Sequence, residues 1–232
     1  MKKKLIIVSI VIFILISALA YYGIFLKGVG TISDLYSEEC KLDIPKIISK
    51  TDYNNNGIPD SEDILIGARK DADNKPTYVS KYYTGGYPPD NEGVCTDVVW
   101  RAFKEAGYNL KDMVDKDIRS NVNLYPRVSG KPDANIDFRR VPNLKVFFDR
   151  KFKKLILEII PNNIENLSEW QGGDIVVFGK PTDHIAIVSD KRNKEGVPYI
   201  IHNSGPYTQE VDVLLHWKDN ISPIIGHYRI KK

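Results

Sequence analysis

The sequence predicts an α+β fold, in which helices come first along the chain and antiparallel strands follow. Residues 96–106 have the 3.6-residue apolar period of a helix. Several short segments after Gly173 have the length and the β-branched composition of strands instead. Helices and strands that are segregated along the chain in this way are typical of the α+β class.

The first 26 residues predict a membrane segment. Met1-Lys2-Lys3-Lys4 is basic, and residues 5–26 form an uncharged, mostly apolar run of 22 residues, which is long enough to span a bilayer. The basic start places the N-terminus in the cytoplasm and the remaining chain outside, as a single-pass membrane protein. Ala18-Leu19-Ala20 resembles a signal-peptidase site, so a cleaved signal peptide and a secreted protein are the alternative. Both interpretations predict an exported domain.

The rest of the chain is predicted to form one main domain with a short extension. Lys2, Lys3 and Lys4 account for the whole net charge of +3, so residues 27–232 are neutral. A neutral domain lacks the basic field that favours nucleic acid, and we expect no nucleic-acid partner. We divide this part into a tether (27–45), a helix–loop–helix (46–73) and a main domain (74–232).

A calcium-binding loop is predicted between two helices expected over residues 44–50 and 61–73. Oxygen donors occur at the spacing of an EF-hand loop: Asp52, Asn54, Asn56, the Ile58 carbonyl, Asp60 and Asp63. Gly57 stands where such a loop turns sharply. Because a calcium ion needs six or more converging oxygens, this spacing predicts a structural calcium site. The alternative is a polar turn that binds nothing.

The middle of the chain predicts a helix between less regular segments. Residues 74–92 are rich in Pro, Gly and Tyr and are typical of an ordered loop. The helix over 96–106 ends at Gly107, a residue suited to the left-handed backbone at a helix end. Residues 119–142 lack periodicity, and a short helix is expected over 143–153.

Four strands are predicted in the last third of the chain. They cover residues 174–178, 184–189, 198–202 and 225–230. The first two are expected to form an antiparallel hairpin, because only a short segment separates them.

Cys95 is the candidate nucleophile. It directly precedes the predicted helix, and a helix N-terminus favours the thiolate of a group whose ordinary pKa is about 8.5. A thiol nucleophile also needs an imidazole as its base. His184 opens one predicted strand and His202 ends the next, where His202 is placed to bond the His184 ring and fix its tautomer.

Other interpretations of these residues stay open at this point. Cys40 and Cys95 can form a disulfide in an exported protein. His184 on its own also fits a surface histidine at a strand edge. A zinc site from Cys95, His184 and His202 is conceivable, although the chain has no close ligand pair such as C-x₂-C.

The chain resembles a known bacterial family in five segments. These are 93–99, 135–144, 183–189, 201–203 and 226–229. Over roughly residues 74–232 it resembles the family called domain of unknown function 1287, and beyond that the NlpC-type cell-wall cysteine peptidases of the papain-like superfamily. The resemblance implies a papain-like core, in which the helix that bears the nucleophile packs on an antiparallel sheet.

The resemblance also implies roles and a substrate. Cys95 would be the nucleophile, His184 the general base and His202 the residue that orients His184, with Asn203 as the alternative orienter. The implied enzyme is a cysteine peptidase or amidase of the cell envelope, which cleaves peptidoglycan stem peptides through a thioester and needs no catalytic cofactor. Two alternatives are a catalytically inactive envelope-binding module and an acyltransferase with the same Cys–His site.

Three residues of the irregular segment are weaker candidates for substrate binding. They are Asp137, Arg139 and Arg140. An arginine fork suits a substrate carboxylate, but a structural ion pair explains the same residues equally well. His227 and Arg229, on the last predicted strand, are expected to be structural.

Overall fold

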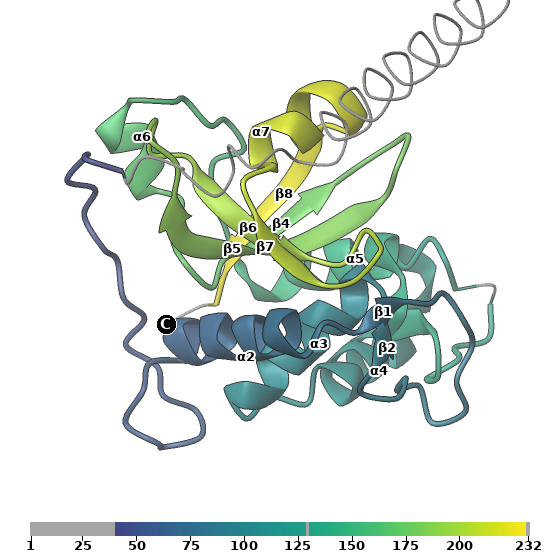
Figure 1. Ribbon diagram of the computed structural model, residues 1–232. Helices are drawn as coiled ribbons and strands as arrows, with labels where there is room; N and C mark the ends of the chain where they lie inside the picture. The colour runs from purple at the N-terminus through teal and green to yellow at the C-terminus, as the bar shows by residue number, and fades with distance from the viewer. Residues whose placement is uncertain (1–39, 129, 231–232) are drawn as a thin grey trace, which may run out of the picture. The chain divides into compact units, whose positions relative to one another are not determined.

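The computed structural model describes residues 40–128 and 130–230 (Figure 1). The predicted membrane anchor or signal peptide and most of the predicted tether lie outside these residues. In the part of the chain that is described, no helix is both long enough and apolar enough to cross a membrane.

A six-stranded antiparallel sheet forms the centre of the fold, in the order β3-β8-β4-β5-β6-β7 (Figure 1). Its strands are β3 (Lys153–Lys154), β4 (Ile175–Phe178), β5 (His184–Arg192), β6 (Pro198–His202), β7 (Gln209–Val211) and β8 (Ile224–Arg229). A separate parallel pair joins β1 (Thr77–Tyr78) to β2 (Glu92–Gly93). β2 ends just before Cys95, so this small pair leads the chain into the candidate site.

Helices cover both faces of the large sheet. The longer helices lie on one face: α2 (Asp60–Asn74), α3 (Cys95–Glu105), α4 (Leu110–Ser120) and α5 (Val141–Lys151). On the other face lie α6 (Ile164–Ser168), α7 (Leu214–His216) and the turn η4 (Trp217–Ile221). Short turns η2 (Val122–Leu124) and η3 (Asp137–Arg139) connect α4 to α5.

Strand β5 contributes to two hydrophobic cores because its side chains alternate between the two faces of the sheet. Ile185 and Ile187 belong to the core shared with the longer helices. Ala186 and Val188 belong to the core on the other face, with Trp217. A strand that is buried on both faces is apolar throughout, which explains the unbroken run after His184.

The α+β prediction is confirmed, and so are the helix after Cys95 and the four predicted strands. The helix expected over residues 44–50 is wrong, because these residues have no regular structure. Their backbone pairs with a side chain instead: Gln171 accepts from Ile47 N–H at 3.0 Å and donates to the Pro45 carbonyl at 2.9 Å. Seven residues are too few to stabilise a helix against such contacts.

Candidate active site

Cys95 is the first residue of α3 because the chain is capped directly before it. Val94 is extended, and its N–H donates to the Asp97 carboxylate at 2.8 Å, an arrangement typical of a helix start. Cys95 is half-buried, and its sulfur lies against the backbone of Ile185 on β5. The candidate nucleophile therefore meets the residue next to His184.

The two predicted histidines form a buried pair. His184 Nε2 and His202 Nδ1 are 2.8 Å apart, and the two residues are 4% and 3% exposed. Burial lowers the pKa of His202 to about 4. The pKa of His184 is also lowered, by burial first and then by the charge of His202. Both rings are therefore neutral at pH 7, and one of them donates the proton of the shared hydrogen bond.

Trp217 packs against both histidines, a role that was not predicted from the sequence. Its ring stacks on His184 with a centroid distance of 4.1 Å and an interplanar angle of 15°. It also meets His202 edge-on. The indole shields one face of the imidazole from water, which contributes to the burial that keeps His184 neutral.

The Cys95 sulfur is a thiol rather than a preformed thiolate in this arrangement. Burial, and to a lesser degree the negative charge of Asp97, raises the pKa of the Cys95 thiol to about 12. Hydrogen bonds from the backbone of Ile185 and Thr96 act in the opposite direction. Within the described residues, no hydrogen bond joins the sulfur to a ring nitrogen of His184. The site thus pairs a neutral thiol with a neutral imidazole.

Of the two candidate orienters, His202 is the residue that contacts His184. Asn203 is buried in a different role: its amide donates to the carbonyls of Pro76 and Gly93, at 3.0 and 3.4 Å. These bonds hold Pro76, directly before β1, and Gly93, the last residue of β2. Asn203 therefore fixes the backbone that leads into Cys95.

The three weaker candidates for substrate binding, Asp137, Arg139 and Arg140, differ in their contacts and exposure. Arg139 is buried, and its guanidinium bonds the Asp97 carboxylate through two nitrogens, at 2.7 and 2.8 Å. This is the ion pair that the sequence left open as an alternative to substrate binding. Asp137 accepts from Asp133 N–H at 2.7 Å, whereas Arg140 lies 3.8 Å from Asp137 with a side chain that is 38% exposed. Arg140 is thus the freest of the three to meet a ligand.

Comparison with known proteins identifies the family. The model of the family described as Domain of unknown function (DUF1287) matches residues 65–230. The chain belongs to the DUF1287 family. It is also 40% identical over 158 residues to the Escherichia coli (strain K12) protein described as "Uncharacterized protein YijF", a match that covers 66% of this chain and 72% of that protein. Neither description states an activity.

His227 and Arg229 of this DUF1287 chain share one buried carboxylate. Arg229 bonds both oxygens of Asp174 at 2.7 Å, and His227 Nε2 lies 3.1 Å from the same group. The other ring nitrogen of His227 meets the Ile156 carbonyl, and its ring stacks on Trp170 at 3.8 Å. The contacts tie β8 to the turn before β4, which is the structural role expected of both residues.

The predicted calcium loop folds back on itself. The Asp63 carboxylate lies 2.9 Å from the Asn54 amide and 3.0 Å from the Asn56 amide, so three predicted ligands converge. Asp52 accepts from the N–H groups of Asn56 and Gly57, at 3.1 and 2.8 Å. The backbone of Gly57 has φ +86°, a conformation that favours glycine.

Asp60 bonds protein groups rather than pointing toward the other predicted calcium ligands. Its carboxylate accepts from Tyr53 N–H and from the Tyr108 hydroxyl, both at 2.7 Å. Asn54 also donates to the Glu105 carbonyl at 3.0 Å, so the loop is attached to the end of α3. Across residues 40–128 and 130–230, no group of three or more His, Cys, Asp or Glu side chains is arranged to hold a metal ion.

Cys40 and Cys95 are both free thiols. The Cys40 thiol donates to the Leu42 carbonyl, and Leu42 packs against the core that contains Trp217. Cys95 packs against the core on the other face of the sheet. The two cysteines therefore belong to different sides of the sheet and form no disulfide.

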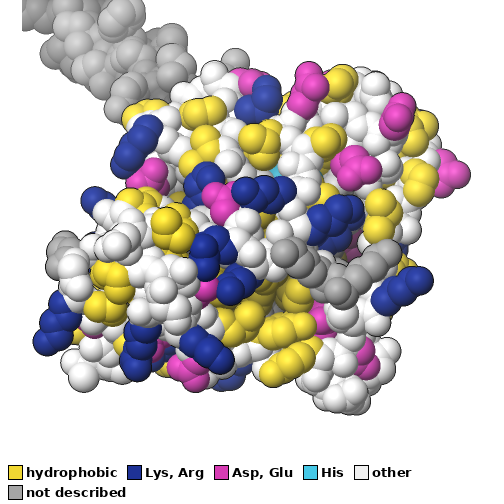
Figure 2. All heavy atoms as spheres, turned by 180° about the vertical axis from the view of Figure 1, so that it is seen from behind, with side chains coloured by type: hydrophobic (Ala, Val, Ile, Leu, Met, Phe, Trp, Pro, Cys, Tyr) yellow, Lys and Arg dark blue, Asp and Glu magenta, His cyan; other side chains and the backbone are white. Residues whose placement is uncertain are grey.

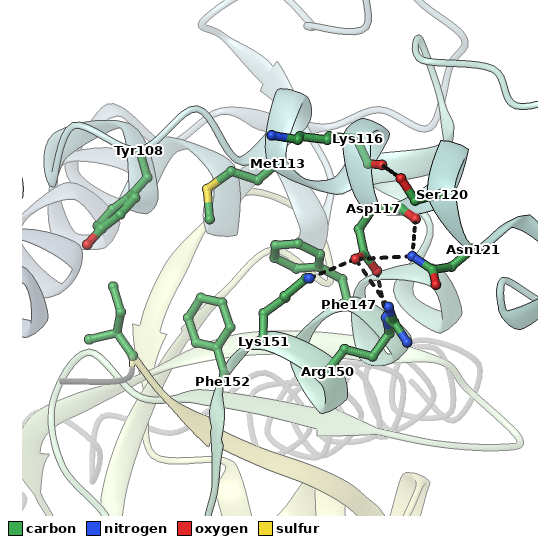
Figure 3. Close-up of a pocket in the computed structure, with 11 residues that line it drawn as sticks. Tyr108, Met113, Lys116, Asp117, Ser120, Asn121, Phe147, Arg150, Lys151 and Phe152 are labelled. Atoms are coloured by element: carbon green, nitrogen blue, oxygen red, sulfur yellow. Dashed lines mark hydrogen bonds and ion pairs between the residues drawn. The ribbon is translucent and has the colours of Figure 1, made fainter.

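The described pockets lie away from Cys95. One of about 500 Å³ lies between α4, α5 and the end of β8 (Figure 3). Its lining residues are Tyr108, Met113, Lys116, Asp117, Ser120, Asn121, Phe147, Arg150, Lys151, Phe152 and Ile230. Most of the dashed contacts in Figure 3 converge on Asp117, which binds Arg150 and Lys151. No residue predicted from the sequence to act in catalysis lines this pocket.

The surface carries both signs of charge. On the face turned away from the view of Figure 1, Lys and Arg side chains are spread among acidic and apolar ones (Figure 2). This mixture fits the neutral charge of residues 27–232.

Proposed function

We propose that this chain is an exported cysteine hydrolase with a papain-like core of the NlpC type. One observation carries the proposal. Cys95, at the start of an 11-residue helix, lies against the backbone beside His184, and His184 is held by His202 at 2.8 Å. A thiol, an imidazole and a group that orients the imidazole are the parts of a cysteine hydrolase.

In the proposed reaction the thiol loses its proton only as it attacks. The Cys95 sulfur forms a bond to the carbonyl carbon of an amide, and the neutral His184 ring accepts the thiol proton. The C–N bond then breaks as His184 returns this proton to the leaving amine, which gives a thioester. Water, deprotonated by His184, attacks the thioester. The S–C bond breaks, His184 returns the proton taken from water to the sulfur, and the carboxylic acid product leaves and loses its remaining proton to solvent.

Two features of the site support this order of events. The pKa of His202 near 4 and the lowered pKa of His184 keep a neutral base available at pH 7. The oxyanion of the tetrahedral intermediate would form at the start of α3, where the Cys95 N–H and the helix dipole favour negative charge.

We propose peptidoglycan stem peptides as the substrate. The basic N-terminus followed by an apolar run places the domain outside a bacterial membrane, beside that polymer. The family likeness to cell-wall peptidases leads to the same substrate. Localisation to the cell membrane, with release if the N-terminal segment is cleaved, belongs to the same proposal.

The test is digestion of purified peptidoglycan by the protein and by Cys95→Ala. We expect stem peptides to be released by the parent protein, and the rate to fall by about 10⁴-fold or more in Cys95→Ala. Cys40→Ala is the matched control and keeps full activity. Equal release by the parent protein and Cys95→Ala would refute Cys95 as the nucleophile, and no release by either would refute this substrate.

An acyltransferase remains the second candidate, because it uses the same thioester. It differs only in whether an amine or water attacks that intermediate, so analysis of the products separates the two activities. Because Cys40 and Cys95 are both free, there is no support for an inactive binding module built on their disulfide.

We also propose that the loop from Asp52 to Asp63 holds a structural calcium ion. The convergence of Asn54, Asn56 and Asp63 supports it. The amide nitrogens of both asparagines donate to Asp63 in this structure, so each amide would have to turn over to offer its oxygen to the ion. Because Asp60 is bonded to two tyrosines, it would reach the ion through water, as position 9 often does.

Calcium should raise the thermal stability of the protein. With Kd between about 10⁻⁴ and 10⁻³ M, 10 mM calcium would add about 1.4 to 2.7 kcal/mol to the free energy of unfolding. Differential scanning fluorimetry should show a rise of several degrees that is absent in Asp52→Asn. An unchanged melting temperature at 10 mM calcium, with magnesium as the ionic-strength control, would contradict the proposal.

A further inference from the structure

The ion pair between Asp97 and Arg139 lies beside the start of α3. The side chains are 0% and 2% exposed, and the carboxylate is bonded by both Nε and Nη2 of the guanidinium. The Asp97 carboxylate also accepts from Val94 N–H and from the Trp100 indole, each at 2.8 Å. The Asp97 carboxylate therefore links Val94, directly before the helix, to Trp100 within it.

Arg139 connects the same helix start to two other segments. Its Nη1 donates to the Lys81 carbonyl at 2.9 Å, and its guanidinium lies 4.9 Å from the centre of the Tyr83 ring. Its own carbonyl accepts from the Thr96 hydroxyl at 3.2 Å. The loop after β1 and the turn η3 are thus fixed to the residues on either side of Cys95.

The pair also controls the charge near the sulfur. The titratable groups near Cys95 are Tyr78 from β1 and Asp97 from α3, together with His184, which precedes Ile185 on β5, and its partner His202. Tyr78, His184 and His202 are neutral at pH 7, whereas the Asp97 carboxylate is ion-paired with Arg139. The guanidinium of Arg139 offsets the negative charge of the Asp97 carboxylate at 2.7 Å, so loss of either partner would leave one unpaired buried charge beside the thiol.

We propose that Asp97 and Arg139 are positioning residues for Cys95, which fix the start of α3 and keep the charge beside the sulfur neutral. The proposal rests on the role of Cys95 as the nucleophile, but it concerns only the thiol and can be tested without any substrate. It predicts effects of opposite sign for the two partners, whereas a merely structural pair would give effects of the same sign.

The experiment measures alkylation of Cys95 by iodoacetamide in the full chain between pH 8 and 10, in a Cys40→Ser background. The rate there follows the thiolate fraction, which changes tenfold for each unit of pKa. Arg139→Gln leaves the negative charge of Asp97 and should lower the rate about tenfold. Asp97→Asn leaves the positive charge of Arg139 and should raise it about tenfold. The double variant should return to within about threefold of the parent rate.

The matched control is Arg229→Gln. It breaks the ion pair with Asp174, which has the same two-nitrogen geometry but lies before β4, at the end of that strand away from Cys95. It should lower the melting temperature and leave the alkylation rate unchanged.

Three results would overturn the proposal: rate changes of the same sign in both single variants, no change in either, or an equal change in Arg229→Gln. If Arg139→Gln does not fold, Arg139→Lys replaces it, with a rate within about threefold of the parent because the charge is kept. Failure of peptidoglycan digestion with an intact opposite-sign pattern would overturn the substrate and leave the positioning role standing.

Discussion

The side chains of the candidate site pack on different faces of the sheet. His184 begins β5, and its ring lies with Trp217 among the residues of the second core. Cys95 packs against the first core, beside the backbone of Ile185. The thiol therefore lies beside Ile185, the residue that follows His184, while the imidazole packs on the other face of the sheet.

Protonation of the histidine pair should weaken the fold. Both rings have a lower pKa in the folded protein than their ordinary value of 6.5, so the unfolded chain binds protons first as the pH falls. The stability is complete above pH 6.5 and is lost as the pH falls toward the folded pKa of about 4. For His202 alone, the loss between pH 7 and pH 5 is about 2 kcal/mol.

Urea denaturation at pH 7 and pH 5 measures this loss of stability on protonation of the histidine pair. In His202→Gln, the stability difference between the two pH values should be about 2 kcal/mol smaller than in the parent protein. The exposed residue His216 supplies the control, since His216→Gln should keep the parent's pH dependence. An unchanged pH dependence in His202→Gln would contradict the buried, neutral state of the pair.

At the scale of elements, the start of α2 lies against the turn that leads into β4. Gly173 has φ +86°, and a Cβ atom built on it would lie 2.1 Å from the Ser61 carbonyl oxygen. Its N–H donates to the Val188 carbonyl at 2.9 Å. The helix and the sheet can approach this closely only because the residue has no side chain.

Gly173→Ala should therefore lower the free energy of unfolding by more than the strain of the left-handed backbone alone would. We expect a loss of about 1 to 2 kcal/mol from the left-handed backbone, and roughly as much again because α2 must move. Gly85→Ala provides the comparison, since Gly85 has φ +90° with nothing within 4 Å of the added Cβ. Equal losses for the two variants in urea denaturation would show that the close approach to α2 has no energetic consequence.

Considered as a whole, the described part of the chain has two cores that share one sheet. Strands β4 and β5 each place alternate side chains into both cores, so neither core can lose its order while the sheet stays intact. We expect residues 40–230 to unfold in one cooperative step.

Substitutions in the two cores test this cooperativity. Phe148 and Leu214 are fully buried, one in each core. Phe148→Ala should cost about 3 to 5 kcal/mol and Leu214→Ala about 2 to 5 kcal/mol. Each should shift a single transition, with near-ultraviolet and far-ultraviolet circular dichroism changing together. Separate transitions for the two signals would contradict a shared cooperative unit.

Features that depend on local period and spacing could be predicted from the sequence. The helix after Cys95 followed from its apolar period, and the strand after His184 followed from its short length and β-branched composition. Helix α4 has no counterpart among the predicted helices, although Leu110, Val114 and Ile118 repeat every four residues on its buried side. That signal is weak because polar residues surround it.

Features that depend on contacts between distant segments became clear only from the three-dimensional fold. It separated Cys40 from Cys95, gave His202 rather than Asn203 the contact with His184, and placed Arg139 on Asp97. It also replaced the expected helix over residues 44–50 with hydrogen bonds to Gln171. Each of these outcomes depends on partners more than 15 residues away, and no local pattern specifies such a partner.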